Sequence, residues 1–361
     1  MKIIHVETGR HLYGGAQQVL YLMRGLAGRG IDGLLVCMAD SGIDRAARAW
    51  GLRVCNVPCA GDLDLRFAWR LRQLLEKETA DLVHCHSRRG ADFLGGQAAA
   101  MAGIPAIVSR RVDNPETAMG AALRYRKFRK VIAISESIGQ VLRAAGVDAS
   151  RIEIIRSAVD TAAIEQATDP ASFRREFGIR DGDVVIAAAG QLIARKGHRH
   201  LLEALARLVT TRPQLRLIVF GEGPLRAELL QLTSRLQLEQ QVTFAGFRDD
   251  LDAMLGNVDL LVHPALAEGL GVAVLKAAAA AVPVVAFAAG GVREAVSDGE
   301  TGLLVPPADV EALAAAMESL IDDPERRARL GAAGRKRMQT EFTIDVMVEK
   351  HTALYEALLR D

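Results

Sequence analysis

The sequence predicts an α/β protein of two doubly wound domains in tandem, each with a parallel sheet covered by helices on both faces. Its 361 residues are enough for about two domains with sizeable cores. Short apolar runs alternate with helical patterns along the chain, as expected for parallel sheets. The alternation breaks once, at a polar segment over residues 160–170, which indicates a linker between two Rossmann-like domains.

The first domain is predicted over residues 1–163. Apolar runs typical of buried strands lie at 2–6, 33–38, 52–57, 81–86, 106–110, 131–134 and 152–155. Helical patterns lie between them, at 14–28, 63–77, 90–102, 115–128 and 135–145. A glycine pair, Gly14 and Gly15, stands where the first strand leads into the first helix, a place where ligands approach the backbone. The pair is not the G-x-G-x-x-G fingerprint, so a nicotinamide dehydrogenase is disfavoured.

The second domain is predicted over residues 164–342. Strands are expected at 184–189, 215–220, 242–245, 258–262, 284–287 and 302–305, and helices between them and at 309–322 and 325–340. The last segment, 343–361, is an amphipathic helix that we expect to return to the first domain. Two such domains would place the carboxyl ends of their strands across a cleft, which is where ligands bind in these folds.

Charge is divided unevenly along the chain. Residues 1–160 hold 23 Lys and Arg against 16 Asp and Glu, a net +7, whereas the whole chain carries +1. A basic half indicates an anionic partner on that side, although ordinary scatter of surface charge would give a similar difference. No nucleic-acid-reading motif accompanies it, so nucleic acid is not an expected partner.

The expected location is the cytoplasm. No apolar run is long enough to span a bilayer, and Met1 leads directly into a predicted strand, so no signal peptide is expected. The four cysteines form no paired framework, which suits a reducing compartment.

The loop after the strand at 258–262 carries an acid, Glu268, and two glycines, Gly269 and Gly271. A glycine turn that opens a helix leaves free backbone N–H groups at a positive dipole end, and this suits a phosphate. The acid could meet a polar group of the same ligand. Alone, the stretch is equally compatible with a plain strand–loop–helix connection.

This stretch resembles the E-x7-E region of the retaining nucleotide-sugar glycosyltransferases of the GT-B fold, family 4. Glu268, Gly269 and Gly271 match that pattern, and Lys276 stands in place of its second Glu. Residues 190–197 are similar to the family's G-R-L-x-x-x-K-G loop. Further matches at 221–224, 290–294 and 299–306 follow in the family's order, and the ordered series is far more specific than any single motif.

The resemblance implies a site for a nucleotide-sugar, which we expect to be a UDP-sugar, with no cofactor and no metal. Glu268 and Lys196 are the implied catalytic residues. The implied donor-binding residues are Gly190, Gln191, Arg195, Gly221, Gly269, Leu270, Gly271, Val272 and Lys276.

Two departures change the expected donor contacts. Gln191 replaces an Arg of the family, which removes a bidentate phosphate contact, and Arg195 is expected to replace it in part. Lys276 has three donors and no acceptor. It could therefore bind ribose oxygens, reach a phosphate, pair with a nearby acid or point away. We hypothesise a retained ribose contact of inverted polarity.

The first domain matches the family more loosely. A His that often follows the fifth strand in the family is absent, because residues 109–113 read Ser-Arg-Arg-Val-Asp. The expected acceptor-side residues are Gly14, Gly15, His86, Arg110 and Arg111. The acceptor is expected to be a glycan or a lipid-linked sugar.

Two other features of the first domain have alternative interpretations. In the run His84-Cys85-His86, alternation puts both imidazoles on one face. Zinc accepts such ligands, but no further ligand pair stands nearby, and an acceptor role for His86 is favoured over a metal. The basic run from Arg124 to Lys130 is either a solvated helix end or a contact with an anionic membrane surface.

The sequence therefore predicts a retaining glycosyltransferase of cell-surface polysaccharide or lipopolysaccharide synthesis, with peripheral attachment to the inner membrane face as a further expectation. Two other functions stay open. One is a sugar-nucleotide epimerase of the same architecture. The other is a non-catalytic nucleotide-sugar binder, suggested by the residues that depart from the family.

Overall fold

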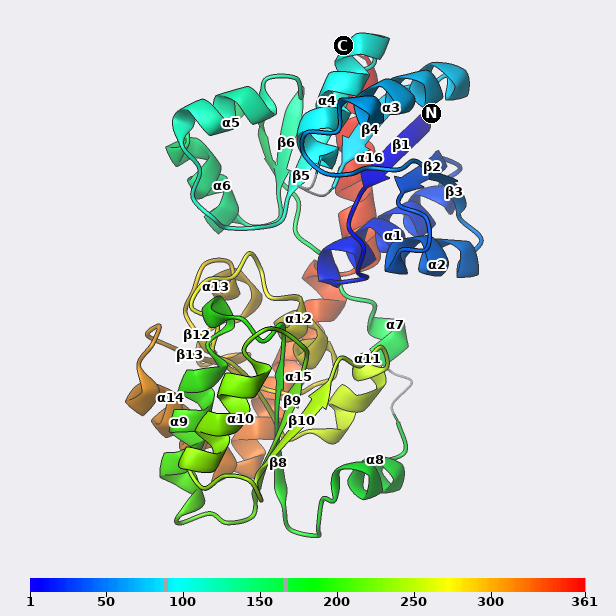
Figure 1. Cartoon of the computed structure of the whole chain (residues 1–361). Coiled ribbons are helices and arrows are strands. Elements are labelled where there is room, and N and C mark those ends of the chain that lie inside the picture. The colour runs from blue at the N-terminus through cyan, green and yellow to red at the C-terminus, as the bar shows by residue number, and fades with distance from the viewer. Residues whose placement is uncertain (87–89, 165–167, 361) are drawn as a thin grey trace. The chain divides into compact units, whose positions relative to one another are not determined.

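The computed structural model describes residues 1–86, 90–164 and 168–360 and divides the chain into two compact units (Figure 1). The first unit is Met1–Ala158 together with Ile344–Asp361, and the second is Val159–Thr343. Both are α/β units with a parallel sheet, as predicted. Within the described residues, every helix is too short or too polar to cross a lipid bilayer.

The first unit contains a seven-stranded parallel sheet in the order β3-β2-β1-β4-β5-β6-β7. Its strands are β1 (Lys2–Glu7), β2 (Asp32–Cys37), β3 (Arg53–Asn56), β4 (Leu82–Cys85), β5 (Ala106–Arg110), β6 (Lys130–Ala133) and β7 (Ile152–Ile154). The chain runs outward from β1 to β3 and then returns to lay β4 on the other side of β1. The carboxyl ends of β1 and β4 therefore flank the topological switch point, where ligands bind in such sheets.

Helices cover this sheet. They are α1 (Gly14–Ala27), α2 (Gly42–Ala49), α3 (Leu65–Glu78), α4 (Ala91–Ala102), α5 (Ala118–Tyr125) and α6 (Glu136–Ala144), with a short 3-10 turn, η1 (Ala149–Arg151). Helix α2 was not predicted; Ser41 caps it by accepting a hydrogen bond from the Asp44 amide. Helix α5 is shorter than predicted, because Thr117 caps it two residues after Pro115.

The second unit has a six-stranded parallel sheet in the order β10-β9-β8-β11-β12-β13. Its strands are β8 (Val184–Ala189), β9 (Leu215–Phe220), β10 (Val242–Gly246), β11 (Leu260–His263), β12 (Val284–Phe287) and β13 (Gly302–Val305). Its helices and 3-10 turns are α7 (Thr161–Ile164), α8 (Pro170–Phe177), η2 (Ala194–Lys196), α9 (His198–Val209), α10 (Arg226–Arg235), α11 (Leu251–Met254), η3 (Leu255–Asn257), α12 (Val272–Ala279), α13 (Val292–Ala295), α14 (Val310–Ile321) and α15 (Pro324–Glu341). The switch point lies between β8 and β11.

Along the chain, the first unit ends at Ala158, five residues before the predicted boundary at 163. The amide of Val159 donates to the carbonyl oxygen of Phe342 at 2.9 Å, which ties residue 159 to the end of α15. The predicted linker also holds α7, where Asp160 accepts a hydrogen bond from the Ala163 amide at 3.2 Å. A polar composition concealed this short capped helix.

The terminal helix α16 (Ile344–Arg360) belongs to the first unit, as expected. Its Met347, Val348 and Tyr355 join an apolar cluster with residues of β1 and α1. A Cβ atom at Gly25 of α1 would lie 2.4 Å from Val348 Cγ2, so glycine is what lets the two helices approach. Residues from the end of the chain therefore complete the core of the first unit.

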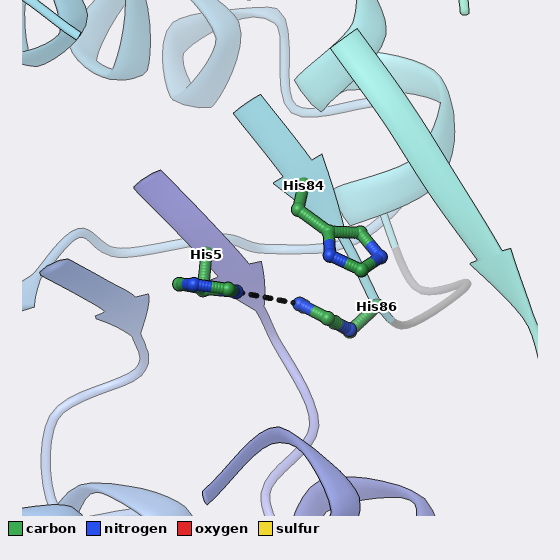
Figure 2. A group of neighbouring side chains, drawn as sticks. All are labelled: His5, His84 and His86. Atoms are coloured by element: carbon green, nitrogen blue, oxygen red, sulfur yellow. Dashed lines mark hydrogen bonds between the residues drawn. The ribbon is translucent and has the colours of Figure 1, made fainter. Parts of the chain in front are cut away.

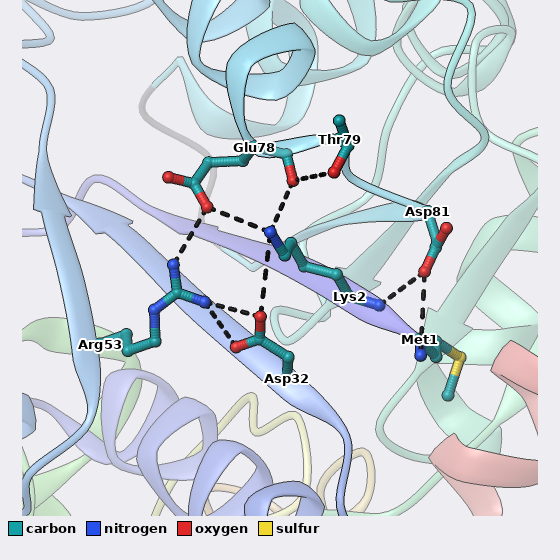
Figure 3. A network of polar contacts seen from close by, with 7 residues as sticks. All are labelled: Met1, Lys2, Asp32, Arg53, Glu78, Thr79 and Asp81. Atoms are coloured by element: carbon teal, nitrogen blue, oxygen red, sulfur yellow. Dashed lines mark hydrogen bonds and ion pairs between the residues drawn. The ribbon is translucent and has the colours of Figure 1, made fainter.

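An ion-pair network joins the amino ends of the strands in the first sheet (Figure 3). Arg53 binds Asp32 at 2.6 Å and Glu78 at 3.0 Å. Lys2 donates to the Glu78 carbonyl oxygen at 2.7 Å, and its backbone amide donates to Asp81 at 2.7 Å. The network lies opposite the carboxyl edge where ligands bind, so we interpret it as structural.

Candidate functional site

The switch point of the second sheet brings together the two residues predicted to be catalytic. Lys196 follows β8 and Glu268 follows β11, and these strands are hydrogen-bonded neighbours. The Lys196 ammonium group forms an ion pair with Glu268 Oε2. His263, the last residue of β11, places Nε2 at 3.0 Å from the same oxygen. The remaining carboxylate oxygen, Oε1, accepts a hydrogen bond from the Gly269 amide at 3.2 Å.

These contacts fix the charge of the acid. Glu268 is only 9% exposed, and burial acts to raise the pKa of its carboxyl group. The hydrogen bond with His263 and the positive charge of Lys196 outweigh burial and hold that pKa well below its usual range. Glu268 is therefore an anion that accepts hydrogen bonds and cannot donate a proton at neutral pH.

Helix α12 begins directly beside this acid. Gly271 occupies the N-cap position with φ +89°, which a residue with a side chain rarely adopts, and Val272 is the first helical residue. Among the described residues, no side chain caps this helix, and its first turn holds no acid. Its first N–H groups and positive dipole end are thus available to an anion, as the sequence analysis expected.

The other predicted donor-side residues form the surrounding loops. A Cβ atom at Gly221 would lie 2.0 Å from the Gly190 carbonyl oxygen, so these two turns touch through their backbones. The Leu266 amide donates to the Arg195 carbonyl oxygen at 2.8 Å, which ties the loop after β8 to the loop after β11. Gln191 is half-buried, and Leu270 is buried. The structure therefore groups the predicted donor residues at one edge of the sheet.

Lys276 has a partner that the sequence analysis did not identify. Its Nζ lies 2.7 Å from Oδ1 of Asp252 on α11, and the two side chains are 14% and 17% exposed. Pairing with an acid was one of the alternatives left open, and it is the contact seen in this structure. The hypothesised ribose contact remains a proposal.

The switch point of the first sheet holds a group of buried histidines (Figure 2). His84 and His86 lie on one face, as alternation predicted, with ring centroids 3.8 Å apart. His5 stands opposite His84 in the register of β1 and β4, and its Nδ1 lies 3.0 Å from His86 Nε2. Burial lowers the pKa of His5 to about 3 and that of the other two rings well below the usual value.

His5 is one further candidate metal ligand beside His84 and His86, where the sequence indicated no further ligand pair. One nitrogen from each of the three rings lies within 4.8 Å of the others, a spacing compatible with one metal ion. However, His84 already uses both nitrogens, in hydrogen bonds with Tyr355 OH at 2.7 Å and Ser109 Oγ at 2.8 Å. A metal would have to displace one of these partners, so its absence stays our prediction.

The two neighbouring arginines predicted on the acceptor side differ in their surroundings. Arg110 is 3% exposed and donates to Glu116, to Tyr125 OH and to the carbonyl oxygens of residues 112 and 114. Arg110 therefore stabilises the loop after β5, and few of its guanidinium N–H groups remain for a ligand. Arg111 instead reaches His86, with a nitrogen 3.5 Å from His86 Nδ1. Gly14 begins α1, and Gly15 lies against Arg111.

The basic run from Arg124 to Lys130 is only partly a free surface. Its two aromatic side chains, Tyr125 and Phe128, are buried in the core, and Arg124 forms an ion pair with Asp92 at 2.5 Å. The exposed cations are those of residues 126, 127 and 129. The aromatic side chains of this run are therefore unavailable to a membrane surface, and the exposed cations are the groups that remain for the predicted contact.

Several residues of both sites were missed by the sequence analysis. His263 carries a usable signal, since it ends a strand five residues before Glu268. His5 lies on the predicted first strand and could have been placed at the switch point by strand order. Asp252 and Tyr355 carry no signal, because their contacts depend on tertiary packing.

The fold and the site together define a two-domain α/β protein of the GT-B class, with an acid, a lysine and a helix N-terminus at the switch point of the second sheet. Two family models together match most of the sequence: "Glycosyltransferase Family 4" over residues 13–163 and "Glycosyl transferases group 1" over residues 169–337. The chain belongs to the glycosyltransferases of the GT-B fold.

Individual relatives are more distant. The chain is 26% identical to a 2-deoxystreptamine glucosyltransferase of Streptomyces kanamyceticus, over 95% of this chain and 98% of that protein. It is 34% identical to a GDP-mannose-dependent monoacylated alpha-(1-6)-phosphatidylinositol monomannoside mannosyltransferase of Corynebacterium glutamicum, over 57% of this chain and only 56% of that protein. The fold is similar to that of HepE from Anabaena in complex with UDP-glucose, with TM-score 0.88, 22% identity and coverage of 99% and 100%.

Proposed function

We propose that this chain is a retaining glycosyltransferase that moves a sugar from a UDP-sugar to a glycan or lipid-linked acceptor, in cell-surface polysaccharide or lipopolysaccharide synthesis. The observation that carries the proposal is the convergence of Glu268, Lys196 and His263 beside the uncapped start of α12. The complexes of HepE with UDP and UDP-glucose support a uridine nucleotide.

Each group has a role that follows from its chemistry. The diphosphate would bind Lys196, Arg195 and the N–H groups at the start of α12 near Gly271. Glu268 would accept hydrogen bonds from hydroxyls of the transferred sugar. Lys196 is paired with Glu268 in this structure, so a bound diphosphate would share the lysine and leave more of the carboxylate's acceptor capacity for the sugar.

The reaction would proceed on one face of the sugar. The bond to the leaving diphosphate breaks, the acceptor hydroxyl attacks from the same side, and its proton passes to a leaving phosphate oxygen. Negative charge grows on the diphosphate during this step, so the fixed donors around it lower the barrier. In this proposal the basic side chains and the helix N-terminus do the work that a divalent metal does in other transferases.

The proposal predicts that UDP and UDP-glucose stabilise the protein against heat, because ligands that bind the folded state raise its stability. Lys196→Ala should weaken both by about 1.5–3 kcal/mol, since it removes a charged contact to phosphate. Lys336→Ala, an exposed lysine of α15, is the matched control and should change nothing. GDP-mannose, the donor in the name of one relative, serves as the competing nucleotide.

The reaction products distinguish the transferase from an epimerase and from a non-catalytic binder. Transfer with the anomeric configuration kept supports the proposal, whereas a UDP-sugar of unchanged mass and altered stereochemistry indicates an epimerase. Tight binding without turnover or slow hydrolysis indicates a non-catalytic binder. Unchanged affinity of Lys196→Ala for UDP would contradict the proposal that Lys196 binds the diphosphate.

A membrane surface is a second proposed partner. Met119 and Leu123 on α5 are 83% and 50% exposed and stand four residues apart, hence on one helix face. The exposed cations Arg126, Lys127 and Arg129 follow at once, so apolar and basic groups are presented together, as membrane-binding helices require. We expect co-sedimentation with anionic vesicles that high salt reverses and that Ser at residues 126, 127 and 129 removes. Equal pelleting of this variant and the parent protein would refute the membrane surface.

A further inference from the structure

A pocket of about 170 Å³ opens at the switch point of the first sheet. Its wall includes Glu7 from the end of β1, Gly15 from α1, His86 from the end of β4 and Arg111 from the loop after β5. All of its lining residues belong to the first unit. The pocket therefore forms without any contribution from the second unit, and its volume suits a phosphate-sized group with part of the molecule that carries it.

The cations in and beside this wall are not equivalent. Arg110 is used by Glu116 and by neighbouring oxygens, and Arg124 is paired with Asp92. Arg111 has its Nε buried without a hydrogen-bond partner among the described residues. Burial lowers the pKa of Arg111 to about 10 even though the charge of Glu7 acts in the opposite direction. Arg111 thus remains a cation at neutral pH, with a guanidinium group whose donors are not saturated.

Glu7 lies in the same pocket wall as Arg111, and its negative charge attracts the guanidinium group. Glu7 Oε1 accepts from the Gly9 amide at 2.7 Å. The acid therefore attracts Arg111 while one of its oxygens is held by the backbone.

The first turn of α1 adds positive potential at the same place. This helix has 14 residues, its N-cap Tyr13 provides no side-chain hydrogen bond, and the described first turn holds no acid. Gly15 lies in the pocket wall, where an added Cβ would stand 3.2 Å from Arg111 Cδ. Glycine therefore leaves room for the arginine beside the helix start. The uncapped N–H groups of α1 and the Arg111 guanidinium both favour an anion in this pocket.

The histidines orient the arginine. Arg111 can only donate, so His86 Nδ1, 3.5 Å away, must accept, and the proton of His86 then sits on Nε2. That N–H points at His5 Nδ1, 3.0 Å away, which in turn accepts (Figure 2). This chain of contacts fixes one tautomer for each ring. His5 and His86 are positioning residues in this arrangement, with His86 facing the pocket.

We propose that this pocket binds a phosphate group carried by the acceptor, so that the acceptor is a phosphate ester of a sugar or of a lipid. The inference rests on the proposed function, because it names the class of acceptor for that transferase. The attacking hydroxyl would belong to the same molecule, held by Arg111 and the start of α1. A planar guanidinium suits this task because it binds two phosphate oxygens at once.

The test uses inorganic phosphate as the probe, titrated by calorimetry into Lys196→Ala, which lacks the proposed donor-side phosphate clamp. We expect one saturable site. Arg111→Gln in that background should weaken phosphate binding at least tenfold, and Arg111→Lys should weaken it less because it keeps the charge. Arg29→Gln, an exposed arginine of the same unit, is the matched control and should leave binding unchanged.

Three results would overturn the proposal: no phosphate binding, equal binding by Arg111→Gln, or loss of the Arg111-dependent phosphate binding when the parent protein is saturated with UDP, which would assign the anion at this pocket to the donor. Each leaves the direct UDP titration as a separate measure of the proposed function. Two competitors distinguish the sources of the phosphate. Displacement of inorganic phosphate by glucose 1-phosphate indicates a soluble acceptor, and displacement by phosphatidic acid vesicles indicates a lipid-borne one. Circular dichroism of each variant confirms that loss of binding is not loss of folding.

Discussion

Lys276 shows how one residue can keep its place in a site while its chemistry changes. The family carries an acid at this position, and here a lysine occupies it and pairs with Asp252 at 2.7 Å. Both side chains are less than one-fifth exposed, so little water screens the pair, and removing one partner leaves a largely buried charge. The pair joins α11 to α12, the helix whose start faces the proposed diphosphate position.

We expect Lys276→Glu to lower the free energy of unfolding by about 1–3 kcal/mol, because two acids would then face each other in a dry setting. Lys276→Glu combined with Asp252→Lys should restore most of the loss, since the pair is rebuilt with its charges exchanged. Urea denaturation of the parent protein and the two variants measures this.

UDP affinity separates this structural role from the ribose contact hypothesised for Lys276. If the lysine also binds ribose, the charge-exchanged variant will be stable but will bind UDP more weakly than the parent. A single variant as stable as the parent would contradict the importance of the ion pair.

The sequence could predict Glu268 and Lys196 in one donor site because their loops resemble the family's motifs. Both loops also follow strands at the carboxyl edge of the predicted sheet, where ligands bind. It could not predict Asp252 as the partner of Lys276, since a short helix with no periodic pattern brings it there. For Arg110 and Arg111 the sequence offered no way to tell a structural arginine from one with free donors. That difference depends on where Glu116 and Tyr125 lie in the folded loop.

At the scale of elements, long periodic segments were predicted well and short capped ones were not. Strands such as β8 and β9 have the predicted bounds, because buried parallel strands are nearly continuous apolar runs. Helices α2 and α7 were missed because they have eight and four residues, too few for a clear helical period. Their boundaries depend on the caps Ser41 and Asp160.

Helix α16 connects the end of the chain to the candidate acceptor side. Its Tyr355 hydroxyl lies 2.7 Å from His84 Nδ1, and its His351 ring lies 5.6 Å from that of His84. The amphipathic pattern predicted the helix, and the expected GT-B fold predicted its return to the first domain. The hydrogen bond to β4 could not be predicted, since it depends on the rotation of α16 about its own axis.

At the scale of the whole molecule, several histidines are buried in their neutral form. Burial lowers the pKa of His5 to about 3 and the pKa of His198 and of His351 to about 4, and it holds those of His84 and His86 well below the usual value. In the unfolded chain each would titrate near its ordinary pKa of about 6.5. Below about pH 6.5 the unfolded state therefore binds protons at these histidines, whereas the folded state does not. The histidines lie in both units of the molecule.

Stability should accordingly be greatest above about pH 7 and should fall as the pH drops from about 6.5 towards 4, by about 2 kcal/mol per buried histidine at pH 5. The lowered pKa of Glu268 also reduces stability as the pH falls, but only below the ordinary carboxyl pKa near 4.3. Between pH 6.5 and pH 5 the histidines therefore account for most of the loss of stability.

Urea denaturation at pH 7.5, 6.5 and 5.5 measures how the free energy of unfolding changes with pH. His351→Gln should reduce the proton uptake on unfolding by about one, whereas His11→Gln, at an exposed position, should leave it unchanged. A free energy of unfolding that stays constant from pH 7 to pH 5 would show that these rings are not buried in the neutral form.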